Sequence, residues 1–279
     1  MSEPTSLGAA IGTLSPPRRM PRNWAPLTDV AIYALSIALV VAAWEWSARR
    51  FGFLALFPPP SVTFPRLLEL ARDGSLGSAA LVSLARILAG FLIGSAAGVL
   101  LGLLTGSSSV LRALLDPYIH FLRFIPPLAW FAPVLLWFGT GELTRVILIV
   151  YTTVFIVTLN TAAGVLAVPA NKPRMARAYG ASDRQVFLLV TLPACVPFIL
   201  TGMRLALGNS FATVVAAEML AANNGLGYMI ASSQMWMDIA AIFTAVIALG
   251  LLGFLADRLL QWLTRRFGGQ YLFGIAQSR

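Results

Sequence analysis

The chain has 279 residues and a formal net charge of +9, yet only 11% of its residues are charged and 58% are hydrophobic. Soluble domains carry about 25% charged residues, so this composition excludes an ordinary soluble globule, whose surface it could not cover. The basic residues lie mainly in the tails and between apolar runs, which favours membrane topology over nucleic-acid binding as the reason for the positive charge.

Six apolar runs are long enough to cross a bilayer, because a hydrocarbon core of about 30 Å requires roughly 20 helical residues. Lipid offers no hydrogen-bond partners to the backbone, so each run is predicted to be a helix and the fold to be all-α. The predicted spans are residues 27–47, 83–105, 118–138, 142–163, 194–222 and 239–263, the third interrupted by Pro126, Pro127 and Pro133.

We divide the chain into an N-terminal tail (1–26), a transmembrane domain (27–265) and a C-terminal tail (266–279). Cytoplasmic segments of membrane proteins carry an excess of lysine and arginine. When both termini are placed in the cytoplasm, the cytoplasmic segments hold most of the basic residues, including those of the loop 168–193. The sequence therefore predicts a multi-pass membrane protein with both termini in the cytoplasm.

Segment 58–78, between the first two spans, begins with a proline-rich turn and continues as a short amphipathic helix. Phe64, Leu67 and Leu68 fall at helical spacing, with Arg66 and Glu69 on the opposite face. Two interpretations stay open: a helix that lies in the membrane interface, or a surface that binds an extracytoplasmic partner.

A glycine recurs at every fourth position of the second span. Because four residues is slightly more than one helical turn, these glycines form one smooth ridge along the helix. Small residues let helix backbones approach closely in lipid, so the ridge indicates tight packing inside the bundle, with a seam between subunits as the alternative. Its members are Gly90, Gly94, Gly98, Gly102 and Gly106.

The loop 168–193 is polar and basic, and its stretch 174–183 predicts a short helix. Small residues there leave a close-fitting surface, Gly180 permits a bend that other residues resist, and Tyr179 is an aromatic side chain of the kind that anchors interfaces. Pro193 is expected to begin the fifth span, where its missing N–H costs little. The alternative is an ordinary basic loop that only sets topology. The candidate docking residues are Arg174, Ala176, Arg177, Tyr179, Gly180, Ala181, Ser182 and Pro193.

Ionisable residues inside spans are candidates for function. Arg204 is expected near mid-membrane depth, where it could ease the passage of an anion or pair with a carboxylate and hold helices together. Glu218 would repel an anion, so we interpret it as a packing or gating residue. The candidate translocation path comprises Arg204, Asn209, Ser210, Thr213, Glu218 and, on the fourth span, Asn160.

The segment 223–238 is predicted to be an extracytoplasmic loop. It contains Gly225 and Gly227, and a hinge near a gate and a plain turn fit these glycines equally well.

Motifs for chemistry are missing from the sequence. It contains no phosphate-binding loop of the pattern G-x-x-x-x-G-K-[ST], and no set of His, Cys and carboxylate residues has the spacing of a metal site. The sequence therefore indicates a chain that is not itself an enzyme and that binds no ATP, cofactor or metal on its own.

Several blocks together resemble a known family. Met175, Ala176, Gly180, Val190, Leu192 and Pro193 fall at the positions of the motif Glu-Ala-Ala, three residues, Gly, nine residues, Ile, one residue, Leu-Pro. FIPPLAWFAPVLLWFGTGE (124–142), YGAS (179–182) and VVAAEMLAANNGLGYMI (214–230) extend the likeness over about residues 44–266. These blocks resemble the permease subunits of bacterial ABC importers, in the branch that carries taurine, alkanesulfonates and nitrate. The leading Glu of the motif is Arg174 here, which puts its usual salt bridge to the ATPase in doubt.

The resemblance implies a permease of MetI-like fold that works as a homodimer in the bacterial inner membrane. It implies two cytoplasmic ATPase subunits, which bind ATP and Mg, and a periplasmic substrate-binding protein as partners. Loop 168–193 would then hold the coupling helix that contacts the ATPase. The implied cargo is a small organic sulfonate, with taurine first because LFPPP (56–60) and PPLAW (126–130) are similar to taurine permeases. Alkanesulfonate, nitrate and an aromatic carboxylate are the alternatives.

A secondary transporter or channel that uses no ATP is the alternative class, and a membrane scaffold without cargo is a weaker one. Secondary transporters tend to contain inverted repeats and broken helices at the midplane. The two halves of this sequence show no repeat, although the Pro126–Pro127 break keeps the alternative open.

Overall fold

A computed structural model describes residues 26–50 and 56–276, and within these ranges all regular elements are helices. The expected N-terminal tail therefore lies outside the described residues except for Pro26. The chain divides into two compact units, residues 1–52 and 53–279. The first unit contributes α1 (Pro26–Arg50), whose Ile32, Leu35 and Leu39 are all more than half exposed, as expected of a helix that faces lipid.

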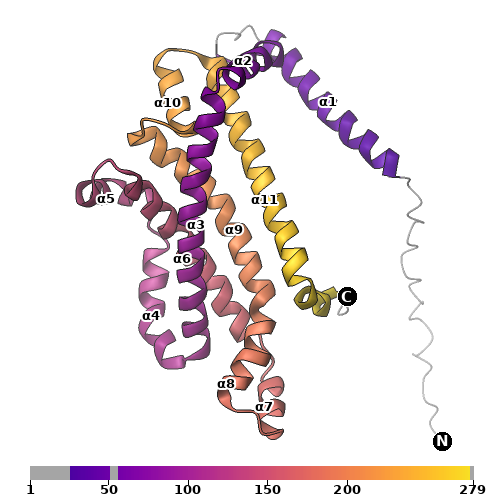
Figure 1. The fold of residues 1–279 in the computed structure, drawn as a ribbon, viewed down its shortest axis with the longest axis vertical. Coiled ribbons are helices and arrows are strands. Elements are labelled where there is room, and N and C mark those ends of the chain that lie inside the picture. Colours follow the sequence, from indigo (N-terminus) through magenta and orange to yellow (C-terminus); the bar gives the residue numbers. More distant parts are fainter. Residues whose placement is uncertain (1–25, 51–55, 277–279) are drawn as a thin grey trace, which may run out of the picture. The chain divides into compact units, whose positions relative to one another are not determined.

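The second unit begins with α2 (Pro60–Arg72), and four of its later helices are 25 residues or longer (Figure 1). Its elements are α2 (Pro60–Arg72), α3 (Ser75–Ser107), α4 (Ser109–Leu122), η1 (Pro127–Trp130), α5 (Phe131–Phe138), α6 (Glu142–Leu166), α7 (Asn171–Ala178), α8 (Asp183–Val186), the π-helix η2 (Phe187–Thr191), α9 (Leu192–Ala221), α10 (Leu226–Met235) and α11 (Ile239–Ala276). We call the end at which α2 and α10 lie the upper end, and the end at which α7 and α8 lie the lower end, as in Figure 1.

The core of this unit is the packing of α3, α6 and α9. Ile87, Ile149, Val157 and Val214, from all three helices, are completely buried. The glycine ridge of α3 lies against a matching row on α6, where the facing residues are Ile149, Thr153, Val157, Thr161 and Val165. A Cβ at any of the five glycines would lie 2.5–2.8 Å from an α6 atom, so the ridge lies inside the protomer and fixes the separation of the two helices.

The predicted third span is broken rather than straight. α4 ends at Leu122, and the η1–α5 segment leaves at 88° to it. Pro126 and Pro127 explain the break, because proline disfavours a helical conformation in the residue before it and lacks the N–H that a helix needs. In the described ranges, five helices are long and apolar enough to cross a membrane, or six when this bent pair counts as one span.

The fifth span also differs from the expectation, since its helix does not begin at Pro193. The helical path runs without interruption from Asp183 through η2 into α9. Pro193 lies just after the π-helix, in the first turn of α9. A π-bulge shifts the hydrogen-bond register by one residue, which accommodates the missing proline N–H inside a continuous helix.

Segment 223–238, predicted as a loop, contains the ten-residue helix α10. Gly225 has a φ of +107°, a conformation that side chains resist, and it makes the turn that starts α10. At the other end, α11 continues to Ala276, past the predicted end of the sixth span at residue 263 and into the expected C-terminal tail.

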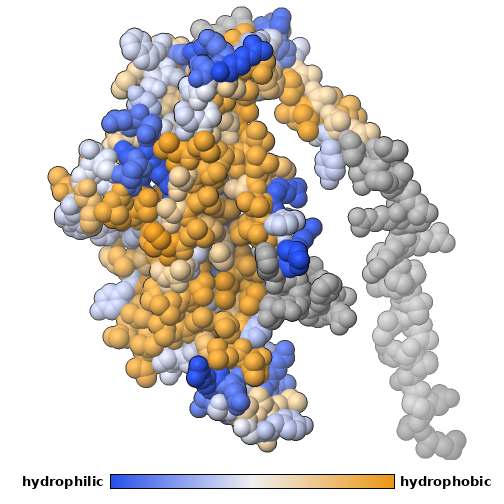
Figure 2. Space-filling view, viewed as in Figure 1, coloured by the Kyte–Doolittle hydropathy of each residue, from blue (hydrophilic) through white to orange (hydrophobic). Residues whose placement is uncertain are grey.

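The amphipathic helix α2 lies at the upper end and is joined to the start of α11. Arg66 Nη2 donates to Asp238 Oδ2 at 2.7 Å, and Arg66 also pairs with Glu69. Hydrogen bonding to Glu69 first, and then to Asp238, raises the pKa of Arg66. Figure 2 shows hydrophilic surface over this upper end and over α7 and α8 at the lower end, with an apolar belt between them.

Candidate functional site

The lower loop forms two short helices that meet at a tight turn. Gly180 N–H donates to Arg177 O at 2.9 Å, Ala181 N–H donates to Ala176 O at 3.0 Å, and Gly180 has a φ of +83°. This pair of bonds is the Schellman arrangement, which requires a left-handed residue after the helix. The predicted single helix over 174–183 is therefore wrong, because Gly180 ends α7 and a new helix, α8, begins at Asp183.

The start of α8 is fixed by a capping box. Ser182 Oγ accepts from the Gln185 N–H at 3.4 Å, and Gln185 Oε1 accepts from the Ser182 N–H at 2.8 Å. These reciprocal bonds satisfy two backbone donors that the helix leaves free. Arg177 Nε donates to Asp183 Oδ1 at 2.9 Å and joins α7 to α8 across the turn. The loop is therefore held in one conformation by its own residues.

This rigid turn exposes apolar side chains. Tyr179 is 89% exposed and Met175 is 59% exposed. Of the candidate docking residues, Arg174, Arg177, Tyr179, Gly180 and Ser182 are exposed, whereas Ala176, Ala181 and Pro193 are half-buried. The first seven candidates lie together on the α7–α8 turn, and Pro193 lies apart from them at the start of α9. A fixed, exposed aromatic residue surrounded by arginines can bind a partner protein.

Two of the predicted path residues line a cavity of about 260 Å³ between α9, α6 and η1, in which polar groups are a minority of an apolar lining. Thr213 and Thr152 share a hydrogen bond of 2.9 Å between their hydroxyl groups. Asn209 Nδ2 donates to Leu205 O at 3.0 Å, and Pro127 and Leu128 of the broken span close the cavity. This lining is uncharged and offers hydroxyl and amide groups.

Ser210 and Asn160 lie between helices. Ser210 is completely buried, and its Oγ contacts Thr153 Oγ1 at 3.1 Å. Asn160 is half-buried and donates to Ile156 O at 2.8 Å. The Cβ of Asn160 fills the space beside Gly202 of α9. The structure therefore places both residues in the contact between α6 and α9, and it does not bring them together with Asn209 in the cavity.

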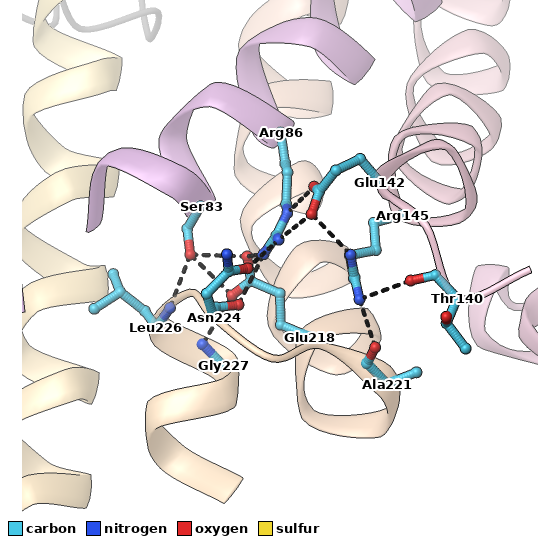
Figure 3. A network of polar contacts seen from close by, with 10 residues as sticks. All are labelled: Ser83, Arg86, Thr140, Glu142, Arg145, Glu218, Ala221, Asn224, Leu226 and Gly227. Carbon is cyan, nitrogen blue, oxygen red and sulfur yellow. Dashed lines mark hydrogen bonds and ion pairs between the residues drawn. The ribbon is translucent and has the colours of Figure 1, made fainter. Parts of the chain in front are cut away.

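Glu218 lies at the centre of a buried polar network at the upper end (Figure 3). Its carboxylate accepts from Ser83 Oγ at 2.8 and 2.9 Å, from Arg86 Nη1 at 2.7 Å and from the Gly227 N–H at 2.9 Å. The Leu226 N–H donates to the same Ser83 hydroxyl. Glu218 therefore joins α3, α9 and the start of α10, and both Glu218 and Arg86 are buried.

Arg86 extends the network to α6 and to the α9–α10 turn. It binds both carboxylate oxygens of Glu142, and it donates to the backbone and side-chain oxygens of Asn224. Arg145 pairs with Glu142 at 2.9 Å and donates to the carbonyl groups of Thr140 and Ala221. Two arginines thus face two glutamates, so the network is neutral. This balance matters because an unpaired charge in a low-dielectric interior costs several kcal/mol.

Arg204 pairs with Asp257 of α11, through Nε at 2.7 Å and Nη2 at 3.0 Å. Arg204 lies 17 residues before Ala221, which corresponds to about 26 Å along the helix. It lies below the Glu218 network and near the middle of the continuous helical path from Asp183 to Ala221. The expected mid-membrane position of Arg204 stays a prediction, and the structure shows the pairing with a carboxylate that was one of its two interpretations.

The sequence did not predict the hydrogen bonds and ion pairs of the Glu218 network or of Arg204. The residues that it missed there are Ser83, Arg86, Glu142, Arg145 and Asp257. Two of these residues, Arg86 and Arg145, are arginines. A signal was present, because both arginines lie inside helices that also form apolar spans, and charges there need partners. Within the described ranges, no group of three or more His, Cys, Asp or Glu residues is placed to hold a metal ion.

Together, the apolar helices, the broken third span and the exposed α7–α8 turn define a polytopic helical membrane protein with a docking surface at one end. A family model described as "Binding-protein-dependent transport system inner membrane component" matches residues 94–269. The chain belongs to this family of ABC importer permeases.

Curated relatives match nearly the whole chain. The taurine transport system permease protein TauC of Escherichia coli (strain K12) is 32% identical over 257 residues, covering 89% of this chain and 93% of the relative. The nitrate import permease protein NrtB of Synechococcus elongatus (strain ATCC 33912 / PCC 7942 / FACHB-805) is 32% identical over 276 residues, covering 91% and 96%. A solved structure of the MetNI methionine ABC transporter in an inward-facing conformation matches with a TM-score of 0.56 at 20% identity. This match covers 66% of this chain and 93% of the solved chain.

These findings confirm the predicted class and fold. The protein is a multi-pass permease subunit of an ABC importer with a MetI-like fold. It is the non-catalytic transmembrane part, and ATP hydrolysis belongs to a separate ATPase. The family also implies a binding protein as a partner. The relatives are named for different cargoes, so they leave the cargo open between taurine, nitrate and others.

Proposed function

We propose that two copies of this chain form the membrane channel of an importer for a small organic sulfonate, with taurine as the first candidate. Two cytoplasmic ATPase subunits, which bind ATP and Mg, would drive it, and a periplasmic binding protein would deliver the cargo. The similarity to a taurine permease and to a nitrate permease supports a small cargo that carries an oxyanion group. Alkanesulfonate, nitrate and an aromatic carboxylate are the alternatives.

The observation that carries this proposal is the α7–α8 turn. A conformation fixed by a Schellman turn, a capping box and the Arg177–Asp183 pair holds Tyr179 away from the rest of the chain. Burial of an aromatic residue that is already rigid costs little conformational entropy, so such residues make effective anchors. Because α8, η2 and α9 form one helical path, a displacement of the turn is transmitted to the spanning part of α9.

The proposed orientation places this turn and both termini in the cytoplasm, in the bacterial inner membrane. The turn carries Arg174, Arg177 and Arg184, and Lys172 lies on the same short segment. Such an excess of basic residues is typical of cytoplasmic loops. ATP binding can shift the permease between inward-open and outward-open states only when the ATPases bind one state more tightly than the other.

We further propose that the cargo passes the cavity lined by Asn209 and Thr213. The second Nδ2–H of Asn209 can donate to an anion without holding it as tightly as a cation would. Arg204 contributes little free charge to this path, because Asp257 neutralises it. Glu218 acts as a structural residue in this scheme, because its carboxylate is fully bonded to α3 and α10.

The substitution Gly180→Glu tests the docking proposal. The left-handed backbone and the added carboxylate are expected to distort the turn, so that co-purification of the ATPase falls and uptake is uncoupled from ATP hydrolysis, while the dimer stays folded. Gly139→Glu is a matched control, because Gly139 also has a positive φ (+74°) and open space around it but lies outside the lower loop. Full ATP-driven uptake by Gly180→Glu, or equal loss in both variants, would contradict the proposal.

The cargo is tested with the complete importer in proteoliposomes. ATP-dependent uptake of labelled taurine is expected, and an excess of unlabelled taurine should suppress it more strongly than nitrate does. Uptake of taurine that needs an ion gradient and no ATPase would instead support a secondary transporter. Transport of nitrate but not of taurine would show that nitrate, one of the alternatives, is the cargo.

A further inference from the structure

The π-helix η2 joins the lower turn to the spanning part of α9. The Leu192 N–H donates to Phe187 O, five residues back, whereas the bonds of an α-helix reach four residues back. This part of the helical path therefore holds an additional residue. Each residue of an α-helix turns the chain by about 100°, so η2 decides toward which side of the α9 axis the α7–α8 turn projects.

Above η2, α9 is fixed against rotation about its own axis. Ser210 Oγ contacts Thr153 Oγ1 at 3.1 Å, and Glu218 is bonded to α3 and to the start of α10. A Cβ at Gly202 would lie 2.7 Å from Asn160, so a rotation of α9 would bring larger side chains into a space that is already filled. A change of register in η2 must therefore move the lower turn and not the bundle.

The burial pattern along the path agrees with an additional residue in η2. Val186 is buried although the other residues of α8 are exposed, and Cys195 is completely buried in the second turn of α9. Nine α-helical residues turn the chain through about 900°, which would place these two side chains on opposite faces. When η2 takes up one of the nine, about 80° separates them, so both can face the protein.

Pro193 favours the π register of η2. In a continued α-helix, the ring of Pro193 would clash with the carbonyl group of Leu189, and Pro193 has no N–H to donate. The π-helix ends at Thr191, just before the proline, and a turn closed over five residues instead of four relieves this clash. Pro197 lies four residues later, after a full turn of α-helix, so a proline of the same helix can be replaced without a change at η2.

We propose that η2, stabilised by Pro193, sets the rotational position of the α7–α8 turn about α9, and that the ATPases bind the turns only in this position. Pro193 is thereby a positioning residue, although it lies apart from the other candidate docking residues. The inference rests on the proposed contact between the turn and the ATPase. Two turns have to reach two ATPases at once, and such bivalent binding is lost where the geometry forbids simultaneous contact.

Replacement of Pro193 by alanine separates positioning from stability. Proline is unfavourable inside a helix and alanine is the best helix former, so Pro193→Ala is expected to convert η2 into α-helix. The thermal midpoint should then equal or exceed that of the wild type, while the turn rotates by about 100°. A point on the helix surface, about 5 Å from the axis, would move by about 8 Å.

The first measurement uses the purified full-length permease without its ATPase. Double electron–electron resonance gives the distances from a spin label at Tyr179→Cys to a label at Val110→Cys of α4 or at Leu259→Cys of α11, both of which are exposed positions. Labelled chains are diluted with unlabelled chains, so that each assembly holds one labelled pair. Pro193→Ala should shift at least one of the two distances, and Pro197→Ala, the matched control, should shift neither.

The second measurement is the amount of ATPase that co-purifies with the permease. Pro193→Ala is expected to lower it about tenfold or more, because bivalent contact is lost, and Pro197→Ala should leave it unchanged. Deletion of Leu189 in the Pro193→Ala background should restore it, since an α-helix with one residue fewer returns the turn to its original position. Leu189 is 72% exposed, so its removal takes away no buried contact.

Unshifted distances in Pro193→Ala, a lower thermal midpoint of this variant, or full retention of the ATPase by a shifted turn would each overturn the proposal. A loss of ATPase that the deletion of Leu189 fails to restore would overturn it as well. A wild-type permease that retains no ATPase would instead contradict the proposed function, and the distance measurements would still decide whether η2 positions the turn.

Discussion

At the scale of single residues, the charges inside the spans have mainly structural partners. Glu218 is completely buried and bonded to Ser83, Arg86 and the Gly227 backbone. A buried ion pair contributes little compared with an apolar replacement, but the loss of one partner leaves an uncompensated charge. The network therefore ties the start of α10 to α3 and α9 firmly, at the end of the permease opposite to the α7–α8 turn.

We expect Glu218→Ala to destabilise the permease by about 3 kcal/mol or more, because Arg86 and the Gly227 N–H lose their acceptor in a buried site. The thermal midpoint of the detergent-purified protein measures this loss. Glu69→Gln is the control, since Glu69 pairs with Arg66 but is 64% exposed, and such pairs contribute less than about 1 kcal/mol. Equal midpoints for Glu218→Ala and the wild type would show that the network does not stabilise the folded permease.

At the scale of elements, the contact between α3 and α6 depends on backbone proximity. The five ridge glycines let α3 approach the row from Ile149 to Val165 so closely that a single methyl group has no space. In lipid no hydrophobic effect drives helices together, so close van der Waals contact supplies much of the attraction. The ridge thereby holds α6 as a rigid support for α9, which carries both the candidate path and the lower turn.

Gly98→Ala tests this contact. Its Cβ would lie 2.8 Å from Val154 O and Val157 Cβ, so we expect a loss of about 1–3 kcal/mol from overpacking, read as a lower thermal midpoint. Gly77→Ala, at an open position of the same helix, should be neutral or stabilise by up to about 1 kcal/mol. A ridge that served only a seam between copies would instead leave the unfolding of the monomer unchanged in Gly98→Ala.

At the scale of the whole molecule, the two polar ends have different roles. The lower end has a rigid turn with an exposed aromatic residue, and the upper end has α2, α10 and the buried network (Figure 1). In the proposed orientation, the lower end meets the ATPase and the upper end faces the binding protein. The strongly exposed Met235 and Trp236, between α10 and α11, belong to the upper end.

Single cysteines can decide this orientation. The natural chain has one cysteine, Cys195, which is completely buried. A maleimide is therefore expected to leave it unlabelled. In intact cells, a membrane-impermeant maleimide should label Trp236→Cys, and it should label Tyr179→Cys only after the membrane is permeabilised. The reverse pattern would place the α7–α8 turn outside the cytoplasm and remove the basis for its contact with an ATPase.

The sequence was informative wherever a feature depended on residues close together in the chain. The six apolar runs, the glycine ridge and the bend at Gly180 follow from hydrophobicity, from helical spacing and from the missing Cβ of glycine. It was less informative about boundaries, because Pro193 is a common sign of a helix start and here lies inside a continuous helical path made possible by a π-helix. The site was predictable only in part, since Asn209 and Thr213 line a cavity while Ser210 lies between helices.

The amino-acid sequence alone determined that this protein is a helical membrane protein, because composition and local pattern decide which segments can satisfy their backbone in lipid. Its resemblance to a permease family rested on the motif blocks. Only the tertiary structure decided which charges neutralise each other. Arg86 and Glu218 are 132 residues apart, and Arg204 and Asp257 are 53 residues apart, so no local pattern links them. These pairings depend on how α3, α6, α9 and α11 are placed side by side, which is a property of packing across the bundle.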